Sequence, residues 1–213
     1  MNLIAVRHGE TEWNVQLREM GHLDSPLTAR GVQQTEALGH RLEVLGFDAL
    51  YSSDLGRAIQ TAEIIGAICR KPVHLDSGLR ERHMGVFQGL TREEISERYP
   101  DQLAAYERTG FIDFIPEGES AQDRTDRSAR VLTEIASHHT EQTVVVVTHG
   151  GFLTGFLEFV LGIPFANGRR FRKENAGFNA FEYVEPNWYL QTWNDVSHLR
   201  ANTASCDNIP AKT

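Results

Sequence analysis

Apolar residues recur along this chain in two alternating patterns, one typical of buried strands and one typical of amphipathic helices. Short apolar runs predict strands at 3–6, 47–51, 72–75 and 144–147, and two further strands are predicted at 178–184 and 188–193. Helical spacing predicts helices over 29–45, 55–68, 120–138 and 152–161, and two short helices between 91 and 109 that separate near Pro100. Because strands and helices alternate, we expect a three-layer α/β/α sandwich with a mostly parallel sheet.

Three of the predicted strands lead directly into cationic side chains. The first is followed by Arg7 and His8, the second by a helix that starts near Arg57, and the run Val144–Val147 by His149. In an open α/β sheet the carboxyl ends of parallel strands lie along one edge, and ligands bind in the crevice beyond it. We therefore expect these four side chains to meet in one pocket.

The chain is predicted to form a single domain over residues 1–199, because no internal repeat or linker divides it. The middle segment 81–119 is interpreted as an insertion that could cover the crevice. Residues 200–213 are polar and contain few apolar side chains, so we expect them to form a disordered tail.

Composition narrows the possible partners and the compartment. The 213 residues carry a formal net charge of -8, which argues against a nucleic-acid or membrane surface, since both are bound mainly by clustered Lys and Arg. No signal peptide is recognised at the start, and no apolar run approaches the ~20 residues that span a bilayer. Two cysteines imply no disulfide framework. A cytoplasmic location is the simplest interpretation.

Two arginines and two histidines at one edge suit a tetrahedral dianion, because guanidinium donors match phosphate oxygens. Helix amino ends after Gly9 and Gly150 could add backbone donors. A neutral histidine can also attack phosphorus and form a covalent phosphohistidine, after which the leaving oxygen needs a proton. A carboxyl group with a raised pKa could supply that proton, and Glu81 is the leading candidate.

Four sequence blocks resemble, in order, the signature of the histidine phosphatase, or phosphoglycerate mutase-like, superfamily. They are R-H-G-E-T at 7–11, S-S-D-L-G-R-A-I-Q-T-A at 52–62, L-R-E at 79–81 and T-H-G-G at 148–151. The resemblance implies a phosphoglycerate mutase-like fold. It also implies that His8 is the phosphorylated nucleophile and Glu81 the proton donor. By the same resemblance the phosphoryl ligands are Arg7, Arg57, His149 and Asn14.

The same resemblance leaves two activities open. The segment 81–90 is similar to that of 2,3-bisphosphoglycerate-dependent phosphoglycerate mutases, and Arg92 falls where these carry a lysine for the substrate carboxylate. Against a mutase, Met84 replaces an aromatic residue, the long mutase insertion is missing, and 116–120 resembles the phosphatase branch. We therefore favour a phosphatase, with the mutase as the alternative.

Other classes fit less well. A non-catalytic phospho-ligand binding protein is a further alternative, but such a protein would be expected to lack His8 or Glu81, and both are present. A serine esterase is disfavoured, since no Gly-x-Ser-x-Gly elbow exists. The histidines show no metal-ligand spacing, so neither a metal nor another cofactor is expected. The expected partner is a small phosphorylated metabolite, and a homodimer is compatible with the sequence.

Three local features refine the expected pocket. Met20 precedes Gly21, where the resembling families place a small polar residue or glutamine, so a Met20 that lines the pocket would suit a less polar leaving group. Trp13 is interpreted as a packing residue. The basic run 169–173 is interpreted as a solvated loop, with contact to an anionic substrate as the alternative.

Overall fold

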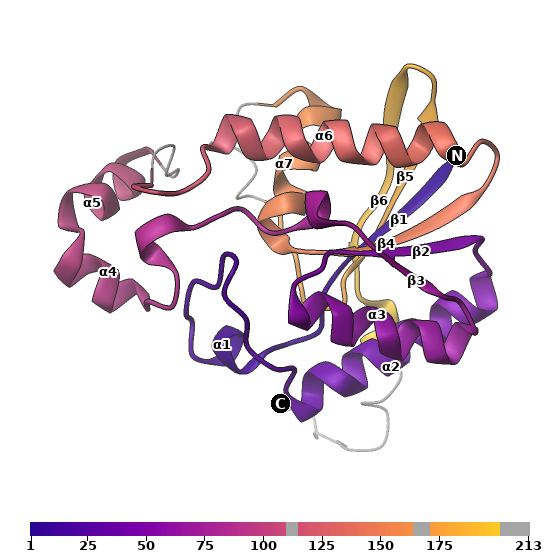
Figure 1. Cartoon of the computed structure of the whole chain (residues 1–213), viewed down its shortest axis with the longest axis horizontal. Coiled ribbons are helices and arrows are strands. Elements are labelled where there is room, and N and C mark those ends of the chain that lie inside the picture. The colour runs from indigo at the N-terminus through magenta and orange to yellow at the C-terminus, as the bar shows by residue number, and fades with distance from the viewer. Residues whose placement is uncertain (110–114, 164–170, 201–213) are drawn as a thin grey trace, which may run out of the picture.

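The structure is a computed structural model that describes residues 1–109, 115–163 and 171–200. Its strands are β1 (Asn2–Arg7), β2 (Ala49–Ser52), β3 (Val73–Leu75), β4 (Thr143–Thr148), β5 (Phe178–Val184) and β6 (Asn187–Asp195). They form one six-stranded sheet in the order β3-β2-β4-β1-β5-β6 (Figure 1). The first four strands in that order pair in parallel and the last two are antiparallel, which confirms the prediction of a mostly parallel sheet.

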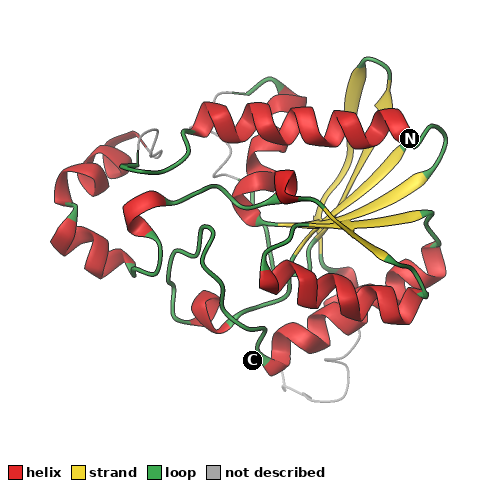
Figure 2. Ribbon diagram, viewed as in Figure 1, coloured by secondary structure: helices red, strands yellow, loops and turns green. Residues whose placement is uncertain are grey.

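Helices cover both faces of this sheet and give the predicted three layers (Figure 2). One layer contains α2 (Ala29–Leu45) and α3 (Gly56–Cys69), and the other contains α6 (Ala121–His138) and α7 (Gly150–Leu161). Side chains alternate between the faces along β1: Leu3 and Ala5 pack under α6 and α7, whereas Ile4 and Val6 pack under α2 and α3. A short helix, α8 (Ser197–Arg200), contacts α2.

The parallel register brings the predicted site residues to one edge. Arg7 at the end of β1 lies opposite Thr148 at the end of β4, so His8 and His149 leave the sheet side by side. Helix α3 begins beyond β2, the other neighbour of β4, and carries Arg57 to the same edge. The strand order thus gathers the cationic side chains at one edge of the sheet.

The segment between β3 and α6 extends away from the sheet (Figure 1). It contains the 3-10 turns η1 (Ser77–Leu79) and η2 (Gly85–Phe87), and the helices α4 (Arg92–Arg98) and α5 (Pro100–Thr109). Phe87, Ile95, Leu103 and Ile115 form a small apolar core of its own. Two short helices separated near Pro100 were predicted here, and Pro100 is the first residue of α5, where its missing amide hydrogen costs nothing.

Several boundaries differ from the sequence predictions. Strand β2 is shifted toward the carboxyl end relative to 47–51, and the helix α1 (Glu12–Val15) was not predicted, although Thr11 and Asn14 form its capping box. Arg200 belongs to α8 rather than to the predicted tail, whose other residues lie outside the described part. Among the described residues, no helix combines the length and the apolar character needed to cross a membrane.

Gly31 lies where α2 touches the loop that follows β1. A Cβ atom at this position would stand 2.0 Å from the backbone oxygen of Glu10, a clash that only a backbone shift relieves. We expect Gly31→Ala to lower the free energy of unfolding by about 1–3 kcal/mol, measured by urea denaturation. Gly39→Ala in the same helix is the matched control, because its nearest neighbour would be the flexible Cδ1 of Ile68. Equal losses in the two variants would contradict this packing explanation.

Candidate active site

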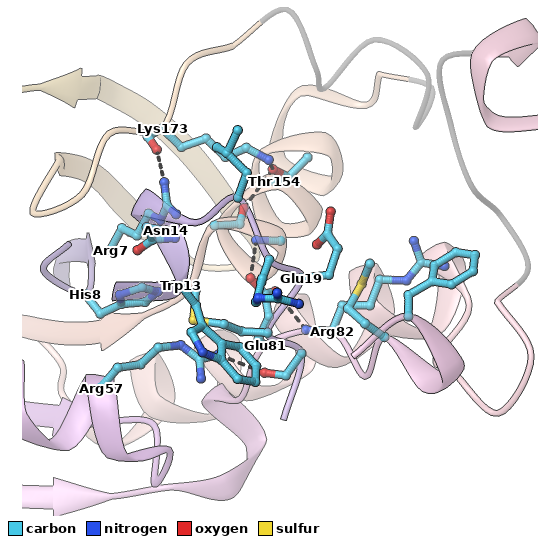
Figure 3. Close-up of a pocket in the computed structure, with 18 of the residues that line it drawn as sticks. Arg7, His8, Trp13, Asn14, Glu19, Arg57, Glu81, Arg82, Thr154 and Lys173 are labelled. Carbon is cyan, nitrogen blue, oxygen red and sulfur yellow. Dashed lines mark hydrogen bonds between the residues drawn. The ribbon is translucent and has the colours of Figure 1, made fainter. Parts of the chain in front are cut away.

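A cavity of about 700 Å³ lies where β1 and β4 end. Nine of the ten residues that the sequence predicted for the site line it (Figure 3): Arg7, His8, Asn14, Met20, Gly21, Arg57, Glu81, Arg92 and Gly150. The tenth, His149, lies beside His8, with their ring centroids 5.3 Å apart. The strand ends therefore bring together side chains that are up to 142 positions apart, as between Arg7 and His149.

His8 has a defined tautomer and charge. Its Nδ1 lies 2.8 Å from the carbonyl oxygen of Gly9, and because a carbonyl can only accept, Nδ1 carries the hydrogen and Nε2 the lone pair. Burial, followed by the positive charges of Arg57 and Arg7, lowers the pKa of His8 well below its ordinary value. The imidazole is thus neutral at pH 7, which a nucleophilic histidine requires.

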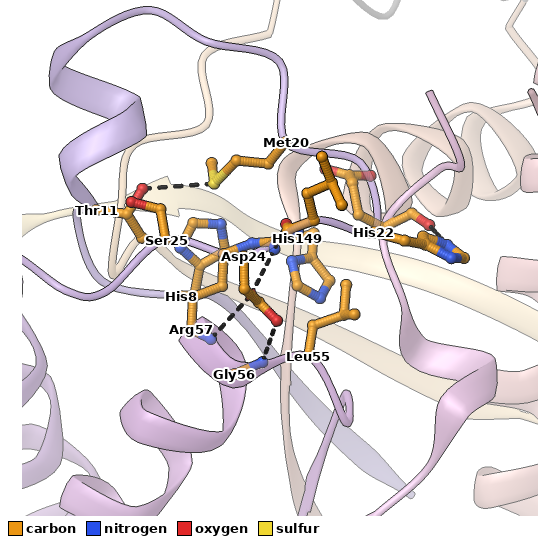
Figure 4. A network of polar contacts seen from close by, with 12 residues as sticks. His8, Thr11, Met20, His22, Asp24, Ser25, Leu55, Gly56, Arg57 and His149 are labelled. Atoms are coloured by element: carbon orange, nitrogen blue, oxygen red, sulfur yellow. Dashed lines mark hydrogen bonds and ion pairs between the residues drawn. The ribbon is translucent and has the colours of Figure 1, made fainter. Parts of the chain in front are cut away.

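Arg57 is held at the start of α3 by Asp24 (Figure 4). The Asp24 carboxylate accepts hydrogen bonds from the Gly56 amide at 2.7 Å and from Arg57 Nη1 at 2.8 Å. Two backbone carbonyl oxygens of the loop 21–24 accept further bonds from this guanidinium, each at 2.8 Å. The N-cap of α3 is Leu55, which gives no side-chain cap, and Asp24 binds the first amides of the helix instead.

Three buried nitrogen atoms around His8 have no hydrogen-bond partner among the described residues: Arg7 Nε, Arg57 Nε and His149 Nδ1. The other side of Arg7 is anchored, since its Nη1 donates to the carbonyl oxygen of Lys173 at 2.6 Å. Buried donors without acceptors are costly and rare in folded proteins, so their gathering indicates a site for an oxyanion. Within the described ranges, no group of three or more His, Cys, Asp and Glu side chains could hold a metal ion.

Glu81 forms another part of the cavity wall, and its carboxylate accepts three backbone hydrogen bonds. The donors are the amides of Arg82 at 2.7 Å, Gly151 at 2.8 Å and Phe152 at 3.0 Å. Burial alone would raise the pKa of Glu81, but these bonds and nearby cationic side chains outweigh it and lower the pKa. The sequence-based expectation of a raised pKa is therefore wrong for this structure, because the three backbone amides and the nearby cationic side chains stabilise the ionised carboxylate.

The predicted backbone donors are also arranged differently. The first amides of α7, beyond Gly150, bind the carboxylate of Glu81. The helix α1, after Gly9, begins at Glu12, whose amide donates to the carbonyl oxygen of Pro26 at 3.1 Å. The amides of Gly151, Phe152 and Glu12 therefore already have acceptors within the protein.

Apolar side chains line much of the remaining cavity wall. Trp13, Leu17 and Met20 come from the segment after β1, and Met84 and Phe87 come from the segment before α4. The interpretation of Trp13 as a packing residue thus missed its place on the wall, which a single aromatic residue in an irregular segment does not reveal. A ligand held at the phosphate end would have this apolar surface beside it.

Met20 and Asn14 both contact Thr11, and Figure 4 shows the contact between Met20 and Thr11. Met20 is 8% exposed, and its sulfur lies 3.5 Å from the Thr11 hydroxyl. The Asn14 side-chain oxygen accepts from the Thr11 amide and from Asn175 Nδ2, each at 3.1 Å. Asn175, which the sequence did not single out, also donates to the carbonyl oxygen of His8 at 3.0 Å and so connects this loop to His8.

Lys173, Thr154, Arg124 and Glu158 line the cavity although the sequence did not predict them. Lys173 belongs to the basic run that was interpreted as a solvated loop, yet its ammonium donates to Thr154 Oγ1 at 2.6 Å. Arg124 and Glu158 form a buried ion pair between α6 and α7. The basic run could have indicated Lys173. Nothing in the sequence indicated Arg124 and Glu158, because isolated charges within amphipathic helices are typical of exposed faces.

Comparison with known proteins identifies relatives over almost the whole chain. The family model of the histidine phosphatase superfamily (branch 1) matches residues 3–196. The curated protein named Probable phosphoglycerate mutase GpmB from Citrobacter koseri is 39% identical over 212 residues, covering 94% of this chain and 96% of the relative.

Two solved structures are similar in both fold and sequence. Mycobacterial glucosyl-3-phosphoglycerate phosphatase, in complex with VO3, has a TM-score of 0.81 and 32% identity, covering 91% of this chain and 98% of its own. A mutant of phosphoserine phosphatase from Entamoeba histolytica, in complex with phosphoserine, has a TM-score of 0.81 and 29% identity, covering 93% of this chain and 98% of its own.

The two buried histidines should make stability fall in mild acid. Burial first, then Arg57, lowers the pKa of His149 as it does that of His8, so each ring stays neutral in the folded chain. The unfolded chain takes up these protons below about pH 6.5, so stability is fully present above that pH and falls as the pH drops, by about 1.4 kcal/mol per pH unit for each histidine. Urea denaturation between pH 7.5 and 5 measures this slope.

In His8→Asn one of these two contributions disappears, so the slope should decrease by about 1.4 kcal/mol per pH unit. The change in packing that accompanies the substitution shifts stability equally at every pH, and the slope is insensitive to it. An identical slope in the variant and the parent protein would show that His8 takes up its proton at the same pH in the folded and unfolded chain, which contradicts a lowered pKa.

Proposed function

Because this chain belongs to the histidine phosphatase superfamily, we propose that it is a phosphatase that hydrolyses small phosphomonoesters without a metal, through a phosphohistidine on His8. Glu81 is the proton donor in this proposal, and Arg7, Arg57 and His149 bind the phosphoryl group. Asn14 and Gly150 are proposed as further contacts of that group, with Met20, Gly21 and Arg92 toward the rest of the substrate.

One observation carries the proposal: a neutral imidazole with its lone pair on Nε2 lies among buried nitrogen atoms that have no hydrogen-bond partner within residues 1–109, 115–163 and 171–200. A phosphoryl group would satisfy Arg7 Nε and Arg57 Nε and remove the cost of leaving them unpaired. The same donors would stabilise the charge on the equatorial oxygens during transfer. Binding and catalysis would thus use the same nitrogen atoms.

The chemistry proceeds in two balanced steps. Nε2 of His8 forms a bond to phosphorus while the bond from phosphorus to the leaving oxygen breaks, and Glu81 gives that oxygen a proton. In the second step water attacks the phosphohistidine, Glu81 takes a proton from the water, and the nitrogen-phosphorus bond breaks to release inorganic phosphate. Glu81 therefore ends each turnover in its starting state.

A phosphoglycerate mutase dependent on 2,3-bisphosphoglycerate is the alternative, and the name of the Citrobacter koseri relative favours it. The mutase would return the phosphoryl group to a substrate hydroxyl instead of water. The two solved relatives are named as phosphatases, which supports hydrolysis. The wall formed by Trp13, Met20 and Met84 supports a leaving group with an apolar part.

The first test offers the purified protein 4-nitrophenyl phosphate in the presence of EDTA. Hydrolysis should persist in the chelator, because the arginines rather than a metal would neutralise the phosphoryl group. His8→Ala removes the nucleophile and should lower kcat/KM at least about 1,000-fold, and Glu81→Gln removes the proton donor and should lower it about 100- to 10,000-fold.

Exposed residues provide matched controls: His40→Ala on α2 and Glu63→Gln on α3 should retain the parent activity. Activity that requires a metal, or that survives in His8→Ala, would refute the proposed mechanism. Addition of 3-phosphoglycerate with 2,3-bisphosphoglycerate separates the two activities, since formation of 2-phosphoglycerate faster than release of inorganic phosphate would identify a mutase.

The lowered pKa of Glu81 predicts where the rate falls with pH. Glu81 is ionised near neutrality in the free protein, so the proton for the leaving group must enter with the substrate. A phosphomonoester carries that proton only below its second pKa of about 6, so kcat/KM should fall about tenfold per pH unit above this value. Steady-state rates from pH 5 to 8 measure the profile, and a kcat/KM that stays constant up to pH 8 would rule out this source of the proton.

A further inference from the structure

Ser53 and His149 form a buried contact next to the phosphate end of the cavity. Ser53 follows β2 and His149 follows β4, so the parallel pairing of these strands brings the two residues together. Nε2 of His149 lies 2.8 Å from the Ser53 hydroxyl oxygen, and both side chains are fully buried. Figure 4 shows the His149 ring next to His8. This contact lies on the side of the His149 ring remote from Nδ1, the atom without a partner.

The hydrogen bonds of Ser53 indicate which atom of the pair donates. Its hydroxyl oxygen accepts a bond from the Leu55 amide at 3.3 Å. The hydroxyl hydrogen then needs an acceptor of its own, and Nε2 of His149 lies within bonding distance. If the hydroxyl donates to Nε2, the remaining hydrogen of a neutral imidazole must lie on Nδ1.

We propose that Ser53 is a positioning residue, which holds the neutral ring of His149 in the tautomer whose Nδ1–H donates to a phosphoryl oxygen. This inference rests on the function proposed above, because it assigns the unpaired nitrogen of His149 to the same phosphoryl group. Ser53 itself would not touch the substrate and would act only through the imidazole.

The other tautomer of His149, with its hydrogen on Nε2, would not bind an anion through Nδ1. A lone pair on Nδ1 would face the phosphoryl oxygens and repel them, whereas an N–H would add to the donors Arg7 Nε and Arg57 Nε. Burial, followed by the charge of Arg57, lowers the pKa of His149 well below its ordinary value, so the ring is neutral. Only in a neutral ring does a neighbouring hydroxyl decide which nitrogen is the donor.

The tautomer of His149 can be measured directly by ¹⁵N NMR of histidine-labelled protein at pH 7.5, with and without inorganic phosphate. We expect the parent protein to carry the His149 hydrogen on Nδ1 in both states. Ser53→Ala should lose this preference, bind inorganic phosphate about tenfold more weakly and hydrolyse 4-nitrophenyl phosphate with about tenfold lower kcat/KM. Ser53→Thr retains the hydroxyl and should restore the tautomer and the affinity.

Ser52→Ala is the matched control, because Ser52 is equally buried but its hydroxyl donates to the carbonyl oxygen of Ser53 at 2.9 Å. Ser52→Ala removes a serine hydroxyl at the adjacent position, and the variant should keep the parent tautomer and phosphate affinity. If Ser53→Ala does not fold, the spectrum of the parent protein and the Ser53→Thr variant still decide the question.

Three outcomes would overturn the inference: an Nε2–H tautomer in the parent protein, a doubly protonated ring in the phosphate complex, or equal phosphate affinity in Ser53→Ala and Ser52→Ala. None of these measurements depends on turnover. Activity that survives in His8→Ala would instead refute the proposed function while the tautomer results stand, so the two failures are distinguishable.

Discussion

The site depends on one costly arrangement, which is the burial of guanidinium and imidazole nitrogens that have no hydrogen-bond partner in the described part of the chain. Each such nitrogen gives up its water without gaining a hydrogen bond, and this loss costs about 1–3 kcal/mol. The chain limits the cost by bonding the remaining nitrogens of the same side chains: Asp24 and backbone carbonyls hold Arg57, and the Lys173 carbonyl holds Arg7. The donors are therefore fixed in direction before any phosphate arrives, which is what preorganised electrostatic stabilisation requires.

Glu81 links this site to the segment that carries α4 and α5. Its ionised carboxylate lies at the amino end of α7, where the helix dipole and two amides favour a negative charge. Gly151 permits the approach, since a Cβ there would stand 2.3 Å from the nearer carboxylate oxygen. The same bonds that position the carboxylate also lower its pKa, so in the proposed mechanism Glu81 acts as an acid only with a proton delivered by the substrate.

Periodicity and strand-end chemistry predicted the sheet, the main helices and the cationic end of the cavity, because register alone decides which strand ends are neighbours. The features that were missed arise from contacts between distant segments. Asp24 caps α3 across 32 positions, and the amides around Glu81 reverse the expected direction of its pKa. Arg124 and Glu158 look like exposed helical charges until α6 and α7 pack together. Such contacts cannot be predicted from local sequence, since nothing in the neighbouring residues of either partner indicates that the two segments meet.

Different parts of the fold form the two ends of the cavity. His8, His149 and Arg57 are held by the register of β1, β4 and β2, so any shift would disturb the whole sheet. The opposite wall comes partly from a segment with its own small core around Phe87 and Ile95. That core can be repacked without moving a strand. If the cationic end binds phosphate as proposed, the same end could be combined with different opposite walls, which is consistent with similar structures whose names specify different phosphoesters.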